Sequence, residues 1–247
     1  MTLCLYLPPY PTIMEPNDLI RIEKFTSKSD SILKNIPPDL RQYLESQMID
    51  KTYRKGQPIF LEGSFPSGIF YLKEGLVKKY KTDHAGKEHI LSLCSNSELI
   101  GYSALLCNEP YPDSASALET SRLGFLPKEV FLKATNQSND LMLGLLSSLS
   151  HEFSVMVNSV MVFAHMTVRE RLAQTLLILS EKFRKKDKPE LVEIVLSRVD
   201  LANMVGTATE TLVRMLQELK KEGVIEMNAK KISILKVKTL IEISKFY

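Results

Sequence analysis

One stretch of the chain places apolar side chains at alternating steps of four and three residues over three heptads. These positions are Met142, Leu146, Leu149, Phe153, Met156, Val160 and Phe163. A heptad pattern of this length is typical of a helix that pairs with a copy of itself. A second apolar row at Leu141, Leu145 and Val157 predicts that the same helix also packs against its own domain. We therefore expect residues 139–166 to form a dimerisation helix and hinge.

The residues before this helix follow a different pattern, in which short apolar runs alternate with turn residues. Glycines at 56, 63, 68, 75, 86 and 101 separate runs of four to eight residues between Tyr53 and Pro127. Such spacing indicates an antiparallel β-roll or barrel. The segment Asp83–Gly86 predicts a hairpin with its glycine in the left-handed region. Residues 31–138 are thus expected to form a β-roll domain, preceded by a lead at 1–30 that is expected to be disordered.

Beyond the heptads, capping residues mark the starts of three further helices. Thr167 and Glu170 have the spacing of a capping box, and a charged loop at 182–188 is expected to end the helix that they begin. Ser197 with Asp200, and Thr207 with Glu210, predict caps for two shorter helices, and Gly206 predicts the tight turn between them.

After Gly223, the runs at 224–226 and 231–235 bracket Asn228 and Ala229 and predict a two-stranded wing. Residues 167–247 are therefore expected to form a winged helix-turn-helix. The fold class of the whole chain is α+β.

The first turns of the second short helix carry the residues expected to contact DNA bases, which are Thr209, Glu210, Val213 and Arg214. Arg214 can donate two hydrogen bonds to guanine O6 and N7, and Glu210 can accept from cytosine N4. The expected DNA backbone contacts are Thr207, Thr211, Lys230 and Lys231. The alternative is structural: Glu210 completes a capping box, and Arg214 forms an ion pair with Glu210 or Glu218.

The charge distribution favours a nucleic-acid partner for the last third of the chain. Residues 167–247 hold 16 Lys and Arg against 11 Asp and Glu, whereas residues 1–166 hold 16 against 18. Double-stranded DNA attracts a basic module of this kind.

Three motifs in this order resemble the Crp–Fnr family of transcription regulators. They are Tyr-Arg-Lys-Gly-Gln-Pro-Ile-Phe-Leu-Glu-Gly at 53–63, Ile-Phe-Tyr-Leu-Lys-Glu-Gly-Leu-Val-Lys at 69–78, and Val-Gly-Thr-Ala-Thr-Glu-Thr-Leu-Val-Arg at 205–214. The resemblance covers the chain from about residue 31 onward. It implies a cyclic-nucleotide-binding-like roll, a homodimer on a palindromic DNA site with half-sites about one helical turn apart, and RNA polymerase as a partner. Thr209 and Val213 differ from the arginine and serine that two branches of the family use, so the outer bases should match neither branch.

The family's effector pocket corresponds here to Glu98, Gly101, Asp113 and Ser114. Glu98 falls on the glutamate that holds the ribose, although alone it is expected to brace a turn. Asp113 falls where an arginine would neutralise the cyclic phosphate, and a carboxylate there repels the phosphate. The resemblance therefore implies a regulator that does not respond to cyclic AMP, with a cyclic-nucleotide-responsive regulator of the same family as the alternative.

Other cofactors and other protein classes find little support in the residues. Three scattered cysteines do not supply the thiolates of an iron–sulfur cluster, and Cys94 and Cys107 are expected to be inert core thiols. No metal site and no catalytic set is expected, so the chain is not predicted to be an enzyme. No apolar run is long enough to span a membrane, and no signal peptide is expected, so the predicted location is the cytoplasm. Met14 is an alternative to Met1 as the natural start.

Overall fold

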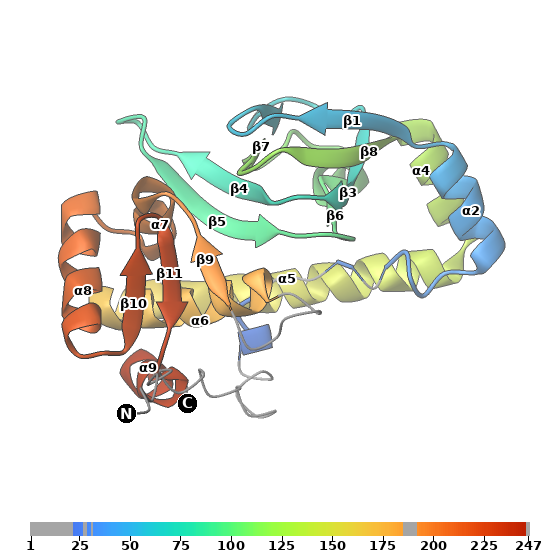
Figure 1. Ribbon diagram of the computed structural model, residues 1–247. Helices are drawn as coiled ribbons and strands as arrows, with labels where there is room; N and C mark the ends of the chain where they lie inside the picture. The colour runs from blue at the N-terminus through green and yellow to red at the C-terminus, as the bar shows by residue number, and fades with distance from the viewer. Residues whose placement is uncertain (1–21, 27–28, 31, 185–191, 246–247) are drawn as a thin grey trace, which may run out of the picture. The chain divides into compact units, whose positions relative to one another are not determined.

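The computed structural model describes residues 22–26, 29–30, 32–184 and 192–245 (Figure 1). The chain divides into two compact units, Thr26–Asn158 and a second that combines Met1–Phe25 with Ser159–Tyr247. The division falls inside one helix, α5 (Asn139–His165). Most of the expected lead at 1–30 and the end of the expected loop at 182–188 lie outside the described residues. Among the described helices, none combines the length and the apolar composition needed to cross a lipid bilayer.

Two four-stranded antiparallel sheets form the roll of the first unit, as the glycine-separated runs predict (Figure 1). One sheet has the order β1-β8-β3-β6, and the other has the order β2-β7-β4-β5. Their bounds are β1 Ile49–Tyr53, β2 Pro58–Phe60, β3 Gly68–Glu74, β4 Val77–Thr82, β5 Glu88–Cys94, β6 Leu99–Ile100, β7 Ser114–Ala117 and β8 Ser121–Pro127.

The hairpin between β4 and β5 confirms the prediction at Asp83–Gly86. Gly86 has a φ of 79°, a backbone conformation that residues other than glycine rarely adopt. The Asp83 carboxylate accepts hydrogen bonds from the backbone N–H groups of Ala85 and Lys87, each at 2.9 Å. These bonds hold the turn that aligns the two strands.

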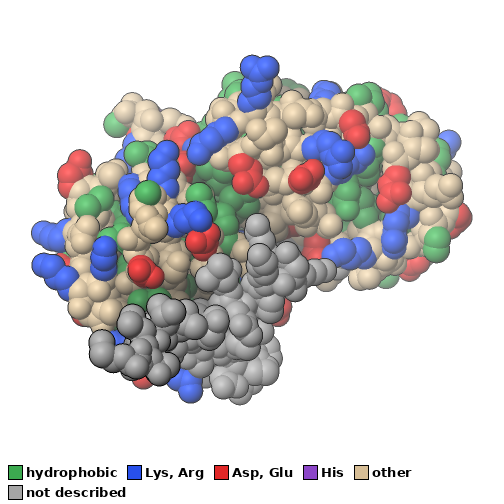
Figure 2. Space-filling view, in the orientation of Figure 1, with side chains coloured by type: hydrophobic (Ala, Val, Ile, Leu, Met, Phe, Trp, Pro, Cys, Tyr) green, Lys and Arg blue, Asp and Glu red, His purple; other side chains and the backbone are tan. Residues whose placement is uncertain are grey.

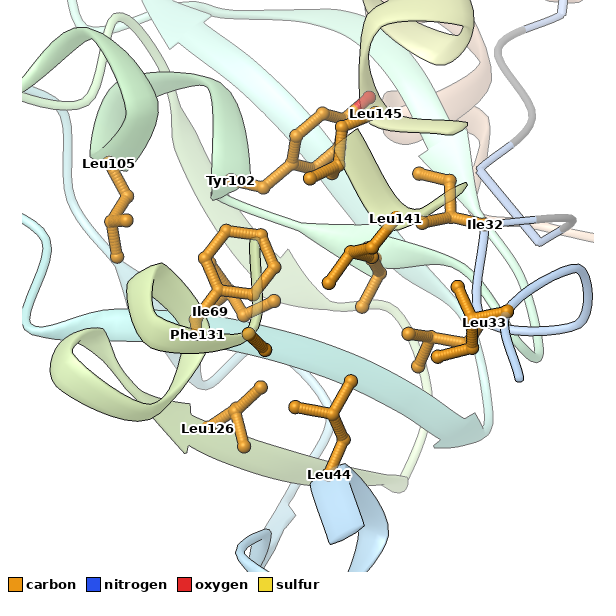
Figure 3. Packing of buried hydrophobic residues seen from close by; sticks show 13 residues of the cluster. Ile32, Leu33, Leu44, Ile69, Tyr102, Leu105, Leu126, Phe131, Leu141 and Leu145 are labelled. Atoms are coloured by element: carbon orange, nitrogen blue, oxygen red, sulfur yellow. The ribbon is translucent and has the colours of Figure 1, made fainter. Parts of the chain in front are cut away.

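Helices cover this roll and share a core with it. They are α2 (Pro38–Ser46), α3 (Tyr102–Cys107), α4 (Lys128–Gln137) and the first part of α5. Figure 3 shows Leu141 and Leu145 of α5 in the same cluster as Phe131 of α4 and Ile69 of β3. Leu141 and Leu145 have no exposed surface, so the predicted inward row of α5 is confirmed at these two positions.

The prediction is wrong for Val157, the third residue of that row. Val157 is 47% exposed, and Val155 is the buried valine instead. Val155 lies 14 residues after Leu141, which is close to four turns at about 3.6 residues per turn, and therefore returns to the same face. Val157 is rotated about half a turn away from that face.

Ser29 and Asp30, the last residues of the expected lead, belong to the roll unit. The Ser29 hydroxyl donates to the Leu99 carbonyl at 3.1 Å and accepts from the Leu99 N–H at 2.8 Å. Ser29 is buried, so this pairing satisfies both backbone groups of a residue in β6.

From Ser159 onward, the described residues of the second unit form the end of α5, four further helices and a three-stranded sheet with the order β10-β11-β9. The elements are α6 Val168–Phe183, β9 Glu193–Val195, α7 Arg198–Val205, α8 Thr209–Lys221, β10 Ile225–Asn228, β11 Lys231–Ile234 and α9 Val237–Ser244. The predicted wing is present as β10 and β11, but it has a third strand, β9, that the two-stranded prediction lacked. Residues 231–233 pair with 193–195, about 38 positions apart, and no local signal marks such a pairing.

Two of the three predicted caps in this unit are confirmed. Thr167 and Glu170 form a complete capping box at the start of α6, and Ser197 accepts a hydrogen bond from the Asp200 N–H at the start of α7. The third prediction, a cap formed by Thr207 and Glu210, is wrong. The residue that precedes α8 is Ala208, which has no side-chain acceptor. Because Gly206 ends α7 with a φ of 70°, α8 starts one residue later than a cap at Thr207 requires.

Candidate nucleic-acid interface

Helix α8 separates an apolar face from a polar one. Leu212, Leu216 and Leu219 are buried against the unit's own core, whereas Glu210 and Arg214 are exposed. Val213, the apolar member of the expected base-contacting set, is 40% exposed, and Thr209 is half-buried. The helix therefore presents the predicted polar residues on its outer side.

Neither structural interpretation of Glu210 and Arg214 fits the structure. Helix α8 has no capping box, and Glu218 pairs with Arg169, whose Nη1 lies 3.5 Å from the glutamate oxygen. Within the described part of the chain, the side chains of Glu210 and Arg214 form no hydrogen bond and no ion pair. Their hydrogen-bonding groups remain available to a partner.

The expected backbone contacts surround this face. Thr207 and Thr211 are half-buried near the start of α8, while Lys230 and Lys231 are exposed at the turn of the wing. Lys231 forms an ion pair with Glu193 of β9 at 2.7 Å. An exposed pair of this kind is weak, so a DNA phosphate could take the place of the Glu193 carboxylate. Several Lys and Arg side chains lie on the surface of this unit in the view of Figure 2.

Arg198 supports the wing turn, and sequence inspection missed this role. Its Nη2 donates to the Ala229 carbonyl at 3.2 Å, and its Nη1 lies 3.5 Å from the Lys230 carbonyl. Ala229 has a φ of 52°, and burial lowers the pKa of Arg198. A hollow of about 300 Å³ lies here, lined by Arg198, Val213, Leu216, Gln217, Lys220, Met227 and Ala229. No sequence signal connects an arginine to a turn some 31 residues away.

In the roll unit, Glu98 braces a turn, as expected. Its Oε1 accepts from the Ser95 N–H at 3.0 Å and from the Ser95 hydroxyl at 2.8 Å. Glu98 is buried in this arrangement. A ribose hydroxyl would have to compete with these two bonds.

Asp113 pairs with a lysine that the sequence did not single out. Lys79 of β4 places its Nζ 3.2 Å from an Asp113 oxygen, and the Asp113 side chain is only 9% exposed. Burial by itself lowers the pKa of Lys79, but the charges of Asp113 and Glu152 outweigh it, so this pKa lies above its ordinary value. Lys79 is therefore a cation that neutralises Asp113 from within the protein.

A second polar group joins α5 to the roll unit. The Tyr102 hydroxyl of α3 donates to Glu152 Oε1 at 2.7 Å and lies 2.8 Å from the Ser148 hydroxyl. Burial, reinforced by the Glu152 charge, raises the pKa of Tyr102. Residues of α5 thus complete hydrogen bonds inside the roll unit.

The two smaller pocket residues also have partners in the protein. Gly101 has a φ of 84°, and a Cβ added to it would lie 3.0 Å from the Tyr111 ring. Tyr111 stacks on Phe60 with ring centroids 3.8 Å apart. The Ser114 hydroxyl accepts from the Glu62 N–H at 3.0 Å. The rings of Tyr111 and Phe60 therefore occupy the space that the missing side chain of Gly101 leaves.

The cysteines differ from one another in exposure. Cys94 is buried, as expected, but the prediction of a core thiol is wrong for Cys107, which is exposed. Cys107 is the last residue of α3, and the chain leaves the helix at Asn108, which has a φ of 54°. The Cys107 side chain therefore faces outward. In the described ranges, no group of three His, Cys, Asp or Glu is placed to hold a metal ion.

The heptad residues of α5 leave a long apolar surface in this single chain. Met142, Leu146, Phe153, Met156, Val160 and Phe163 are between 41% and 63% exposed. Leu149 differs, because it is partly buried against the roll's core. A surface of this extent is typical of a protein interface.

Comparison with known proteins agrees with this architecture. The model of the cyclic nucleotide-binding domain matches residues 50–138, and the model of the Crp-like helix-turn-helix domain matches residues 170–243. The transcriptional activator protein anr of Pseudomonas aeruginosa is 30% identical over 74% of this chain and 75% of its own length. The anaerobic regulatory protein of Pasteurella multocida is 27% identical over 78% of this chain and 71% of its own length.

A solved structure extends the match to three dimensions. A transcriptional regulator of the CRP/FNR family from Thermus thermophilus superposes with a TM-score of 0.62 and 26% identity, covering 80% of this chain and 98% of that one. These relatives are transcription regulators, which are not enzymes. By domain content, domain order and these relatives, the chain belongs to the Crp–Fnr family of transcription regulators.

Proposed function

We propose that the protein binds a palindromic DNA site as a homodimer and contacts the bases with Glu210 and Arg214. The observation that carries this proposal is that both side chains are exposed on α8 and have no internal partner among the described residues. Arg214 contacts guanine and Glu210 contacts cytosine, while Thr209 and Val213 lie against the flanking bases. Thr207, Thr211, Lys230 and Lys231 contact the DNA backbone.

The apolar surface of α5 supports the homodimer. Its exposed heptad positions repeat along the helix as a pairing of two identical helices requires. Two recognition helices related by a two-fold axis contact half-sites about one helical turn apart, which accounts for the palindrome. Such a regulator acts in the cytoplasm, where bacterial DNA and RNA polymerase are found.

We also propose that the roll does not respond to cyclic AMP. Asp113 occupies the position of the phosphate-binding arginine, and Lys79 already neutralises it. A cyclic phosphate would meet a carboxylate at that position, and to bind Lys79 it would have to break an ion pair that is largely shielded from water.

Selection of DNA sites from a random pool by the purified protein, with and without cyclic AMP at one stated salt concentration, tests these statements. We expect recovery of a palindrome without the nucleotide and no change when it is added. A site without two-fold symmetry would contradict the homodimer. Enrichment only in the presence of cyclic AMP would favour the alternative, a cyclic-nucleotide-responsive regulator, to which the match with the cyclic nucleotide-binding domain also points.

A further inference from the structure

One arginine joins the end of α5 to the turn of the helix-turn-helix. Arg171 lies in the first turn of α6, and its guanidinium donates to three backbone carbonyls. Nη1 bonds the Met166 oxygen at 2.8 Å, Nε bonds the Val205 oxygen at 2.9 Å, and Nη2 lies 3.2 Å from the Gly206 oxygen. Met166 follows α5, whereas Val205 and Gly206 end α7. A single planar group thus holds the hinge and the turn together.

Phe163 adds an aromatic contact at the same place. The Arg171 guanidinium carbon lies 5.4 Å from the centre of the Phe163 ring. A Cβ added to Gly206 would come within 2.6 Å of the ring, so the phenylalanine lies directly against the glycine. Phe163 was expected at the dimer interface. One part of its ring packs within its own chain, while 53% of its surface stays exposed.

Arginine suits this position for two physical reasons. Its five N–H donors have a fixed planar arrangement, so one side chain can bond three carbonyls. The entropy cost of these three bonds is that of ordering a single side chain. Its charge also lies beside the last carbonyls of α7, where the helix dipole favours a cation. Lysine carries its three donors on a single nitrogen and lacks the planar fork with which three separate nitrogens of Arg171 contact these oxygens.

We propose that Arg171 and Phe163 are positioning residues that fix the orientation of the helix-turn-helix relative to the end of α5, and thereby set the half-site spacing that the dimer accepts. This proposal rests on the proposed homodimer. If the α5 helices pair, the direction of each recognition helix depends on how rigidly it is joined to its own α5. One added base pair rotates a half-site by about 35° and shifts it by about 3.4 Å, so a rigid connection discriminates strongly between spacings.

The test uses DNA duplexes that carry the selected half-sites at the optimal spacing and with one or two base pairs added or removed. Binding of the full-length protein is measured by fluorescence anisotropy at one salt concentration. The variants are Arg171→Met, Arg171→Lys and Phe163→Leu, and thermal unfolding and dimer mass are recorded for each. Arg169→Met is the matched control, because Arg169 lies on the same helix but joins it to Glu218 of α8 and to Glu222, the residue after α8, and not to α5.

We expect the wild-type protein and Arg169→Met to lose at least about tenfold in affinity for each one-base-pair change in spacing. Arg171→Met should lose less than about threefold across the same series, and Arg171→Lys should not restore the preference. Phe163→Leu should fall between these results.

A folded, dimeric Arg171→Met that keeps the wild-type spacing preference would overturn the positioning role alone. If Arg171→Met does not fold, an unchanged spacing preference in both Phe163→Leu and Arg171→Lys would likewise overturn the positioning role. A wild-type protein without any optimal spacing would instead overturn the proposed dimeric function, and the positioning role with it.

Discussion

The polar residues of the roll differ from those of the recognition helix in where their partners lie. In the roll, Asp113 pairs with Lys79, and Glu98 bonds the backbone and hydroxyl of Ser95. On α8, Glu210 and Arg214 have no partner among the described residues. Among the described residues, the candidate pocket residues Asp113 and Glu98 are thus paired inside the protein, whereas Glu210 and Arg214 of α8 are not.

This difference indicates where binding energy is available. A ligand that enters the roll must replace hydrogen bonds that the protein already makes, and the net gain from such an exchange is small. DNA that meets α8 offers bonds to Glu210 and Arg214, whose side chains have no partner among the described residues. We therefore expect changes in the roll to alter folding stability, and changes on α8 to alter DNA binding.

The largest effect should follow from Lys79→Met. This change removes the cation beside Asp113 and leaves a carboxylate that is only 9% exposed without its partner. The free energy of unfolding should fall by about 3 kcal/mol, the lower end for a broken buried pair, because Lys79 keeps 22% of its surface exposed. Urea unfolding followed by circular dichroism measures this loss.

The double variant Lys79→Met/Asp113→Leu provides the control. Replacing both charges by apolar groups should recover most of the lost stability, because no unpaired charge remains. Equal losses in the single and the double variant would contradict an ion pair that matters for folding. Both variants should select the same DNA site as the wild-type protein.

Arg214→Ala should have the opposite profile. Loss of its two hydrogen bonds to guanine should weaken binding to the selected site by about 1–3 kcal/mol and relax the preference at one base pair. Binding to random DNA should stay nearly unchanged, and so should the unfolding midpoint, because the side chain has no internal partner in the described chain. Competition binding with substituted duplexes measures the preference.

An Arg214→Ala protein that retains its preference at every base would refute the assignment of Arg214 to base contact. A large loss of stability in the same variant would reveal an internal role for this side chain. It would therefore contradict the difference between α8 and the roll described above. Arg169→Ala, on the neighbouring helix, is the control for removing one arginine from this unit.

Local patterns predicted much of the fold. Glycine spacing predicted the roll, the heptads and Leu141 predicted a helix with two faces, and Thr167 predicted the start of α6, because each signal depends on residues close in sequence. The third wing strand and the exposure of Cys107 were not predictable in this way, because distant pairing and local chain direction determine them.

The candidate site shows the same limit more clearly. The polar outer face of α8 follows from helical periodicity, so Glu210 and Arg214 could be named from the sequence. Lys79, Arg171 and Arg198 could not, because each is defined by a partner some 30 residues away on another element. Charged residues whose partners are distant look the same in sequence as solvated ones.

The incorrect cap at Thr207 leads to the prediction with the smallest effect. Ala208 precedes α8 with φ −75° and ψ 150°, the extended backbone that a capping residue adopts, but its methyl group accepts no hydrogen bond. Ala208→Ser should therefore supply an acceptor for an N–H of the first turn and raise the free energy of unfolding by about 0.5–1 kcal/mol. Ser197→Ala, which removes the existing cap of α7, should lower it by about 1 kcal/mol. Ala208→Ser could leave stability unchanged while Ser197→Ala lowers it. The first-turn N–H groups of α8 would then already have another hydrogen-bond acceptor. In that case the start of α8 would resemble the roll, where polar groups are paired inside the protein.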